Sequence, residues 1–271
     1  MALEVGIVGL PNSGKSTLFN ALLKRQVANV AAYPFTTIEP NVGVVEVPDE
    51  RLKKLAEMIK PEKVVPAVVK FIDIAGLIKD SHKGEGLGNK FLAKIREVDA
   101  IIHIIRAFKD ESVSHYYGSI DPKRDKEIVD LELELGEIKK PTLYVLNISV
   151  TSDQQLATSN NFLLVNAKTG GGVDELIKEA YKLLGLITFY TVKGGKEVTA
   201  WSLKGGTAAL EAAEKVHTDM AKGFIKAEVA SFEDLVSADS WQKAKSQGKI
   251  RLEGRDYRVQ DGDVVEFKFG K

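Results

Sequence analysis

The sequence predicts an α/β domain with a mostly parallel sheet, followed by a small α+β domain. Up to residue 184, short β-branched or apolar runs alternate with amphipathic segments, which is the pattern of strands and helices around a parallel sheet. Beyond that point, the pattern indicates several strands and one helix, with an Asp-Gly-Asp turn signal at 261–263. We therefore expect two domains, covering 1–185 and 186–271.

Hydrophobic periodicity and capping residues predict the individual elements. Asp49 is the expected N-cap of one helix, which Pro61 ends, and Asp121 followed by Pro122 is the start signal of another. The predicted strands cover 5–8, 64–74, 101–105, 142–146 and 162–165, then 187–192, 198–201 and 264–269. The predicted helices cover 15–24, 50–59, 122–139, 173–184 and 207–216.

Composition excludes several classes of function. The 271 residues include 38 Lys and Arg, 38 Asp and Glu, and no Cys, so thiol nucleophiles and thiolate zinc sites are excluded. A net charge of zero argues against nucleic-acid binding through bulk charge. Apolar stretches are too short to span a bilayer, and the first residues lack the features of a signal peptide. We therefore expect a soluble, cytoplasmic protein with no membrane partner.

A glycine-rich motif follows the first predicted strand. Residues 9–16 have the sequence G-L-P-N-S-G-K-S, which fits the P-loop pattern G-x-x-x-x-G-K-[ST] and leads into a helix. In such a loop, backbone N–H groups and the helix N-terminus bind phosphate oxygens. Lys15 reaches the β- and γ-phosphates, and the Ser16 hydroxyl ligates Mg²⁺. The alternative is a chance glycine-rich turn, and the strand–loop–helix order argues against it.

Two further segments fit a nucleotide switch. Asp73 and Gly76, in D-I-A-G, follow an apolar strand, where the carboxylate can hold the Mg²⁺ shell through water and the Gly76 N–H can contact a γ-phosphate. Thr37 lies in a loop between the P-loop and Asp73, where it can ligate Mg²⁺ when a triphosphate is bound. An ordinary loop Thr is the alternative, and the flanking motifs favour the switch.

These segments resemble a known family. The stretches G-L-P-N-S-G-K-S-T, Y-P-F-T-T-I-E-P-N and D-I-A-G-L-I-K-D-S-H-K-G-E-G-L-G-N-K-F-L are similar to the Obg superfamily of GTPases, and within it to the YchF family of Obg-like ATPases. The C-terminal stretches L-G-L-I-T-F-Y and E-G-R-D-Y-R-V-Q-D-G-D-V-V-E-F-K-F resemble that family's TGS domain, a β-grasp module.

The resemblance implies a P-loop G domain at 1–185 and a TGS domain at 186–271, with the ribosome or an RNA as partner of the TGS domain. It implies that Ser16 and Thr37 are Mg²⁺ ligands, which join Asp73, the residue placed near the ion by its position after a strand. It also implies that the phosphates are bound by Asn12, Ser13, Gly14, Lys15, Ser16 and Thr17.

The segment that would read the base departs from the usual pattern. Residues 147–150 are N-I-S-V, whereas most GTPases have N-K-x-D here and the YchF family has N-x-x-E. Val150 therefore removes the acid that accepts hydrogen bonds from guanine, so ATP is favoured and GTP remains an alternative. The resemblance implies that Asn147 and Ile148 contact the purine. The alternative for Asn147 is a cap at the end of a strand.

The group that positions the attacking water is not evident. Leu77 follows Gly76, where Ras-like enzymes have a Gln. Related enzymes coordinate a potassium ion through the P-loop position that Asn12 occupies, so K⁺ is a second candidate cofactor beside Mg²⁺. His115 and His82 are further polar candidates, although a lone loop His is more often simply solvated.

The chain is also shorter than the family pattern. The family inserts a long helical coiled-coil domain after the segment that corresponds to 121–125, whereas here the predicted helix continues almost directly to Pro141 and the next strand. The polar stretch 150–161 must connect two parallel strands, a connection that usually takes a dozen or more residues, so we expect a minimal loop or one short turn.

Two functions fit these observations. The first is a P-loop NTPase that switches conformation as it slowly hydrolyses ATP, or less readily GTP. The second is a nucleotide-binding adaptor with little or no hydrolysis, whose TGS domain binds RNA or the ribosome. The first is favoured because Lys15, Ser16, Thr37, Asp73 and Gly76 are all present.

Overall fold

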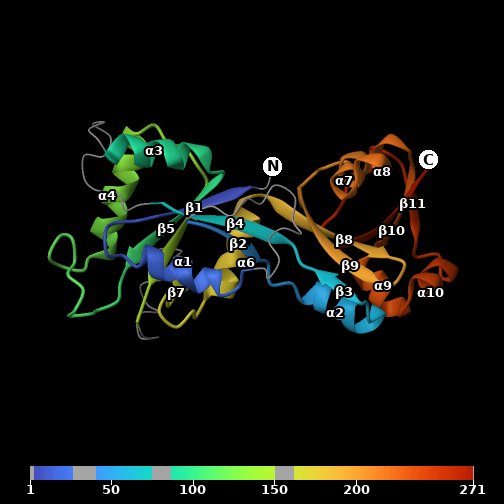
Figure 1. Cartoon of the computed structure of the whole chain (residues 1–271), viewed down its shortest axis with the longest axis horizontal. Coiled ribbons are helices and arrows are strands. Elements are labelled where there is room, and N and C mark those ends of the chain that lie inside the picture. The colour runs from blue at the N-terminus through green and yellow to red at the C-terminus, as the bar shows by residue number, and fades with distance from the viewer. Residues whose placement is uncertain (1–2, 27–40, 75–86, 150–161, 271) are drawn as a thin grey trace. The chain divides into compact units, whose positions relative to one another are not determined.

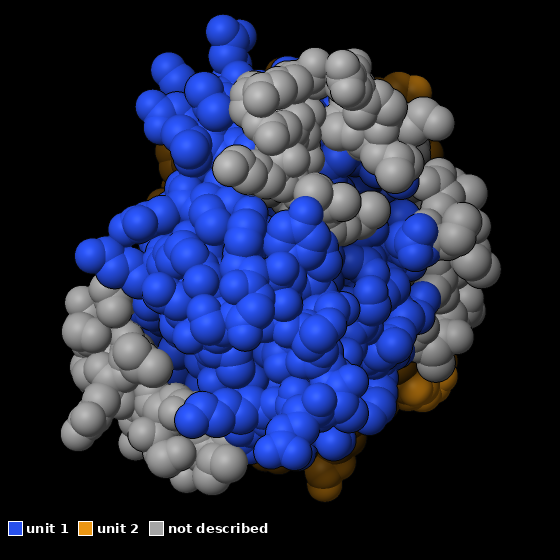
Figure 2. Space-filling model, turned by 90° about the vertical axis from the view of Figure 1, so that its left-hand side faces the viewer, with its two compact units in different colours: residues 1–46, 68–184 blue, residues 47–67, 185–271 orange. Residues whose placement is uncertain are grey.

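The computed structural model describes residues 3–26, 41–74, 87–149 and 162–270. The chain forms two compact units (Figures 1 and 2). The first comprises Met1–Glu46 and Val68–Leu184, and the second comprises Val47–Ala67 and Gly185–Lys271.

The first unit contains a six-stranded sheet with the strand order β2-β4-β1-β5-β6-β7. β2 runs antiparallel to β4, and the other four neighbouring pairs are parallel, which confirms the predicted mostly parallel sheet. The strands are β1 (Glu4–Val8), β2 (Val42–Glu46), β4 (Val68–Asp73), β5 (Ala100–Arg106), β6 (Thr142–Asn147) and β7 (Leu163–Val165).

Helices cover both faces of this sheet (Figure 1). α3 (Leu87–Glu97) and α4 (Pro122–Leu135) cover one face, and α1 (Lys15–Leu23) and α6 (Val173–Leu183) cover the other. On the α3–α4 side, a buried apolar cluster includes Val8, Ile95 and Val129. The parallel strands direct their carboxyl ends to one edge of the sheet, which is where α/β proteins form ligand sites.

The second unit contains a mixed six-stranded sheet with the order β11-β10-β12-β8-β9-β3. β8 pairs antiparallel with β9 and parallel with β12, and a helix, α7, packs on a core that includes Phe189, Val229 and Phe267. The strands are β3 (Lys63–Val65), β8 (Leu186–Lys193), β9 (Glu197–Lys204), β10 (Phe224–Ser231), β11 (Arg251–Glu253) and β12 (Asp263–Phe269). The helices are α2 (Glu50–Ile59), α7 (Ala209–Val216), α8 (Thr218–Lys222), α9 (Phe232–Ala238) and α10 (Trp241–Ser246).

The segment 47–67 belongs to the second compact unit, although it lies between two strands of the first sheet. The buried Tyr190 phenol donates a hydrogen bond to the Asp49 carboxylate, and Arg51 donates two to Asp261, at 2.8 and 3.2 Å. Asp49 also accepts bonds from the Arg51 and Leu52 N–H groups, so its predicted role as an N-cap is confirmed.

Two predicted elements need correction. The single strand expected at 64–74 is two strands, because the chain leaves one sheet at Val65 and enters the other at Val68, on either side of Pro66 and Ala67. The helix expected at 122–139 ends at Leu135, since Gly136 caps it and Glu137 adopts a positive φ of 55°. The Asp121 cap and the proline at its start are as predicted. The stretch 150–161 lies outside the described residues.

Candidate nucleotide-binding site

The P-loop connects β1 to α1, as predicted, and Gly14 shows why its backbone favours glycine. Gly14 has a φ of 97°, which glycine adopts far more readily than other residues. A Cβ atom at Gly14 would lie 2.3 Å from Nδ2 of Asn147, so the site has no room for a side chain here. The helix that follows begins at Lys15 and directs its N-terminus at the loop.

The Lys15 side chain bonds to the inside of the loop. Its side chain is buried, and Nζ donates hydrogen bonds to the carbonyl oxygens of Gly9 at 3.1 Å and Leu10 at 2.9 Å. Burial removes the ammonium from water and lowers the pKa of Lys15 to about 8, while the nearby charge of Asp73 opposes that shift. An anionic ligand would stabilise the charged form of this side chain.

Ser16 and Asp73 lie together as the sequence predicts. The Ser16 hydroxyl donates a hydrogen bond of 3.0 Å to Oδ2 of Asp73. The other carboxylate oxygen, Oδ1, is buried without a hydrogen-bond partner in the described part of the chain. A hydroxyl and a carboxylate with an unsatisfied oxygen are ligands that suit Mg²⁺, so the residues present fit this ion. Thr37 and Gly76, the other predicted switch residues, lie outside the described residues.

A cavity of about 640 Å³ extends from the P-loop to the ends of β5, β6 and β7. This volume falls within the usual range for small-molecule sites. Five of the predicted phosphate-binding residues and two predicted base contacts line it: Asn12, Gly14, Lys15, Ser16 and Thr17, with Asn147 and Ile148. Its other lining residues are Phe108, Lys109, Asp110, Val113, Ser149, Asn166, Ala167, Lys168 and Thr169.

Asn147 joins two loops of the site. Its Nδ2 donates to the carbonyl oxygen of Ser13 at 3.0 Å, and its Oδ1 accepts from the N–H of Ala167 at 3.1 Å. The side chain is buried, and both of its polar groups are engaged by the protein. Asn147 therefore ties the P-loop to the loop after β7, which adds a bridging role to the two that the sequence suggested. Val150 lies outside the described residues.

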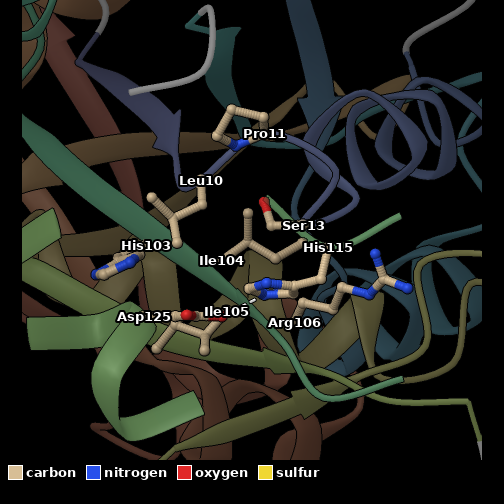
Figure 3. A pocket seen from close by; sticks show the side chains of 9 residues that line it. All are labelled: Leu10, Pro11, Ser13, His103, Ile104, Ile105, Arg106, His115 and Asp125. Carbon is tan, nitrogen blue, oxygen red and sulfur yellow. Dashed lines mark hydrogen bonds and ion pairs between the residues drawn. The ribbon is translucent and has the colours of Figure 1, made fainter. Parts of the chain in front are cut away.

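The two predicted catalytic side chains other than Lys15 have protein partners. Nδ2 of Asn12 donates to the carbonyl oxygen of Ser114 at 3.1 Å. Nδ1 of His115 accepts from the Tyr117 N–H at 3.1 Å, so the ring carries its proton on Nε2, which lies 2.7 Å from Asp125. His115 lines a separate small pocket, where Figure 3 shows its ring facing Asp125, and it is not among the residues around the larger cavity. His82 and Leu77 lie outside the described residues.

Sequence reasoning missed two walls of the cavity, formed by residues 108–113 and 166–169. Neither segment matches a motif considered above. Position in the fold gives the signal, because the segments follow β5 and β7, and their side chains therefore gather with the P-loop at the carboxyl edge of the parallel sheet. That signal could be used only once the structure had given the order of the strands in the sheet.

A P-loop after the first strand, an Asp beside its Ser, and a mostly parallel sheet define this chain as a P-loop NTPase. Comparisons with known proteins agree. Residues 4–148 match the family described as 50S ribosome-binding GTPase, and residues 186–270 match the C-terminal domain of YchF GTPases, a family described as a protein of unknown function. No helix among the described residues has both the length and the apolar character that crossing a bilayer requires.

The chain belongs to the YchF family. It is 39% identical to the ribosome-binding ATPase YchF of Bacillus subtilis, over 99% of this chain and 100% of the relative, and 35% identical to that of Escherichia coli O157:H7, over 99% of each. The structure of the Schizosaccharomyces pombe YchF GTPase matches with a TM-score of 0.80 at 28% identity, covering 98% of this chain and 97% of that one. The predicted resemblance and fold class are therefore confirmed.

The length of the relatives bears on the missing insert. The alignment with the Bacillus subtilis protein runs over 366 positions, whereas this chain has 271 residues. In the structure, only six residues separate the end of α4 at Leu135 from the start of β6 at Thr142. Both observations are consistent with the absence of the helical insert.

Proposed function

We propose that this chain is a nucleotide-dependent switch that binds and slowly hydrolyses ATP and acts with the ribosome. The observation that carries the proposal is a single cavity that joins the P-loop, with Lys15 and Ser16, to the loops after β5, β6 and β7. A triphosphate at the P-loop end and a nucleoside at the other end fit one continuous cavity of this size.

The chemistry at the phosphate end follows from Lys15, Ser16 and Asp73. When a nucleotide binds, the Lys15 ammonium exchanges the carbonyl oxygens of Gly9 and Leu10 for phosphate oxygens, which stabilise its charge better. Ser16 and Asp73 would hold Mg²⁺, which neutralises charge that develops on the phosphates. Thr37 is the further proposed ligand, and Gly76 the proposed γ-phosphate contact.

Adenine is the proposed base. Both polar groups of the Asn147 side chain already bond to the protein, which leaves the backbone of Ile148 and the cavity walls to contact the purine edge. Without an acid at Val150, the N1–H and N2–H₂ donors of guanine lose their acceptor, whereas adenine lacks these donors and loses nothing. GTP remains the second nucleotide to test.

Two measurements distinguish an enzyme that hydrolyses the nucleotide from a protein that only binds it. Phosphate release from ATP and GTP, measured on the purified protein together with the affinity for each, distinguishes a slow ATPase from the alternative of a nucleotide-binding adaptor. Turnover of ATP that exceeds the spontaneous rate supports the enzyme. Tight binding with no release would favour the adaptor, and no binding of either nucleotide would reject both.

The proposed partner is the ribosome, reached through the C-terminal unit, and the proposed compartment is the cytoplasm. The support is that the relatives in Bacillus subtilis and Escherichia coli O157:H7 are named ribosome-binding ATPases and match nearly the whole chain. Co-sedimentation with purified ribosomes, in the presence and absence of ATP, tests it. A chain that stays in the supernatant under both conditions would contradict the proposal.

A further inference from the structure

Arg106 is a buried cation whose side chain bonds to the loop that forms one wall of the cavity. It is the last residue of β5, and only 3% of its surface is exposed. Within the described part of the chain, its hydrogen-bond partners are all main-chain carbonyl oxygens. Nε donates to Phe108 at 3.2 Å, Nη1 to Ser114 at 3.2 Å, and Nη2 to Val113 at 2.8 Å and Asp110 at 3.4 Å.

The segment 107–115, here called the β5 loop, is wrapped around this guanidinium. The guanidinium carbon also lies 4.4 Å from the centroid of the Phe108 ring, a distance at which a cation is attracted to an aromatic face. Four acceptors at successive points of one loop are therefore fixed by one side chain. Hydrogen bonds to a charged donor are stronger than those between neutral groups, so this arrangement gives an otherwise irregular loop one defined shape.

The β5 loop forms part of the cavity. Phe108, Lys109, Asp110 and Val113 line it, whereas Arg106 does not. Arg106 lines the separate small pocket that His115 also lines (Figure 3). The carbonyl oxygen of Ser114 also accepts a bond from Asn12, so the same loop is joined to the P-loop. The conformation of this wall thus depends on a residue that is absent from the cavity surface.

We propose that Arg106 is a positioning residue for nucleotide binding, which orders the β5 loop so that its side chains can contact the nucleoside. The inference rests on the proposed nucleotide-binding function and deepens it. The P-loop backbone and Lys15, which bind the phosphates, do not bond to Arg106, so the proposal assigns Arg106 to the nucleoside part of the ligand.

The chemistry of the side chain makes the proposal specific to arginine. A guanidinium presents five N–H donors in a planar fork, whereas a lysine ammonium is a compact charge with three donors on a flexible stem. Arg106→Lys keeps the charge but cannot reach carbonyl oxygens on all sides of the fork. Arg106→Met removes both the charge and the donors. The matched control is Arg96→Met, since Arg96 also donates to a carbonyl oxygen, that of Gly136, and lies in the same compact unit away from the cavity.

The test compares two probes by isothermal titration calorimetry in the presence of Mg²⁺: ATP, and inorganic tripolyphosphate, which has the phosphates without the nucleoside. For Arg106→Lys we expect ATP affinity to fall roughly tenfold, as when one hydrogen bond to a charged group is lost, with tripolyphosphate affinity unchanged. Hydrogen exchange should become faster in the β5 loop of this variant. Arg96→Met should bind both probes as the unmodified chain does.

The possible results distinguish the role of Arg106 from the proposed nucleotide-binding function. If the unmodified chain binds ATP and Arg106→Lys binds it equally well, the positioning role is wrong and the nucleotide site stands. If ATP and tripolyphosphate affinities fall together, Arg106 supports the fold or the P-loop, and the inference is also wrong. If the unmodified chain binds neither probe, the proposed function is wrong, and the role of Arg106 that depends on it is wrong as well. Arg106→Lys decides the matter should Arg106→Met not fold.

Discussion

The Ser16 hydroxyl lies 3.0 Å from the Asp73 carboxylate, although 57 residues separate the two in sequence. The pairing of two parallel strands brings them together. Ile7 on β1 is in register with Asp73 on β4, and the chain turns through the P-loop directly after β1 to begin α1 at Lys15. The first turn of α1 and the end of β4 therefore meet at one edge of the sheet, where an oxygen of each can share a cation.

The first prediction concerns Lys15. Lys15→Ala should abolish ATP turnover, because it removes the cation that contacts the β- and γ-phosphates. Phosphate release measures the effect, and circular dichroism checks that the fold persists. Lys24→Ala is the matched control, since this exposed lysine follows the same helix and should leave turnover unchanged. Normal turnover in Lys15→Ala would reject the P-loop assignment.

The second prediction follows from the lowered pKa of Lys15. Burial lowers this pKa to about 8, so the side chain loses its proton as the pH rises through that value, while a bound triphosphate would keep it charged. At about pH 8.5, ATP binding should therefore take up a proton, and affinity should fall as the pH rises further. Calorimetry in two buffers of different ionisation enthalpy measures the uptake. A binding enthalpy that is the same in both buffers would contradict the prediction.

A third prediction concerns potassium and Asn12. If a potassium ion replaces the missing Gln, exchange of potassium for sodium should lower turnover, and Asn12→Ala should remove the difference between the two salts. The Asn12 amide nitrogen bonds to the Ser114 carbonyl, and this bond leaves the amide oxygen, the atom that would ligate the ion, unused. Steady-state phosphate release in both salts provides the measurement. Equal rates in the unmodified chain would remove Asn12 and K⁺ from the mechanism.

The fourth prediction separates two roles for His115. The ring bonds to the buried Asp125 at 2.7 Å, so His115→Ala leaves that carboxylate with fewer partners and should destabilise the fold by about 1–3 kcal/mol. Thermal unfolding measures the loss, with Lys123→Ala as a control because Lys123 is an exposed residue near Asp125. Turnover per folded molecule should not change. A loss of turnover without a loss of stability would support the catalytic role that the sequence suggested.

The fifth prediction concerns the base. Val150→Asp should shift preference from ATP towards GTP, because only an acid at this position accepts both the N1–H and N2–H₂ donors of guanine. The gain should be modest, at most about 1.5–3 kcal/mol per hydrogen bond. Competition titrations of ATP and GTP on both proteins measure it, with Val150→Leu as control. Strong GTP preference in the unmodified chain would show that another group reads guanine.

Local sequence patterns predicted most of the helices and strands. They failed where contacts between residues far apart in sequence determine the structure. The P-loop, the Asp49 and Asp121 caps and the parallel strands of the first sheet follow from neighbouring residues, so they were predictable. The antiparallel edge strand β2 was missed. The split between β3 and β4 was not, because a β-rich run is compatible with one strand or two. The wall of the cavity formed by the β5 loop was missed for a related reason, since it carries no motif and is built by contacts to Arg106.

The division into compact units also depends on distant contacts. The compact units divide after Leu184, and a second segment, Val47–Ala67, also belongs with the C-terminal unit. Nothing in that segment alone indicates its partner. Its attachment depends on Tyr190 and Asp261, which lie more than a hundred residues further along the chain.

The sequence by itself determined the chemistry at the proposed phosphate end of the site: a glycine that accepts a positive φ, a lysine, and a hydroxyl at the start of a helix are local requirements of a phosphate-binding loop. Tertiary structure alone decided how the other side chains are used. Asn147 bonds to Ser13 and Ala167, and His115 bonds to Asp125, because the fold brings those groups within reach. A polar side chain bonds to whichever partner is close once water is excluded, and that partner is set by strand order and register.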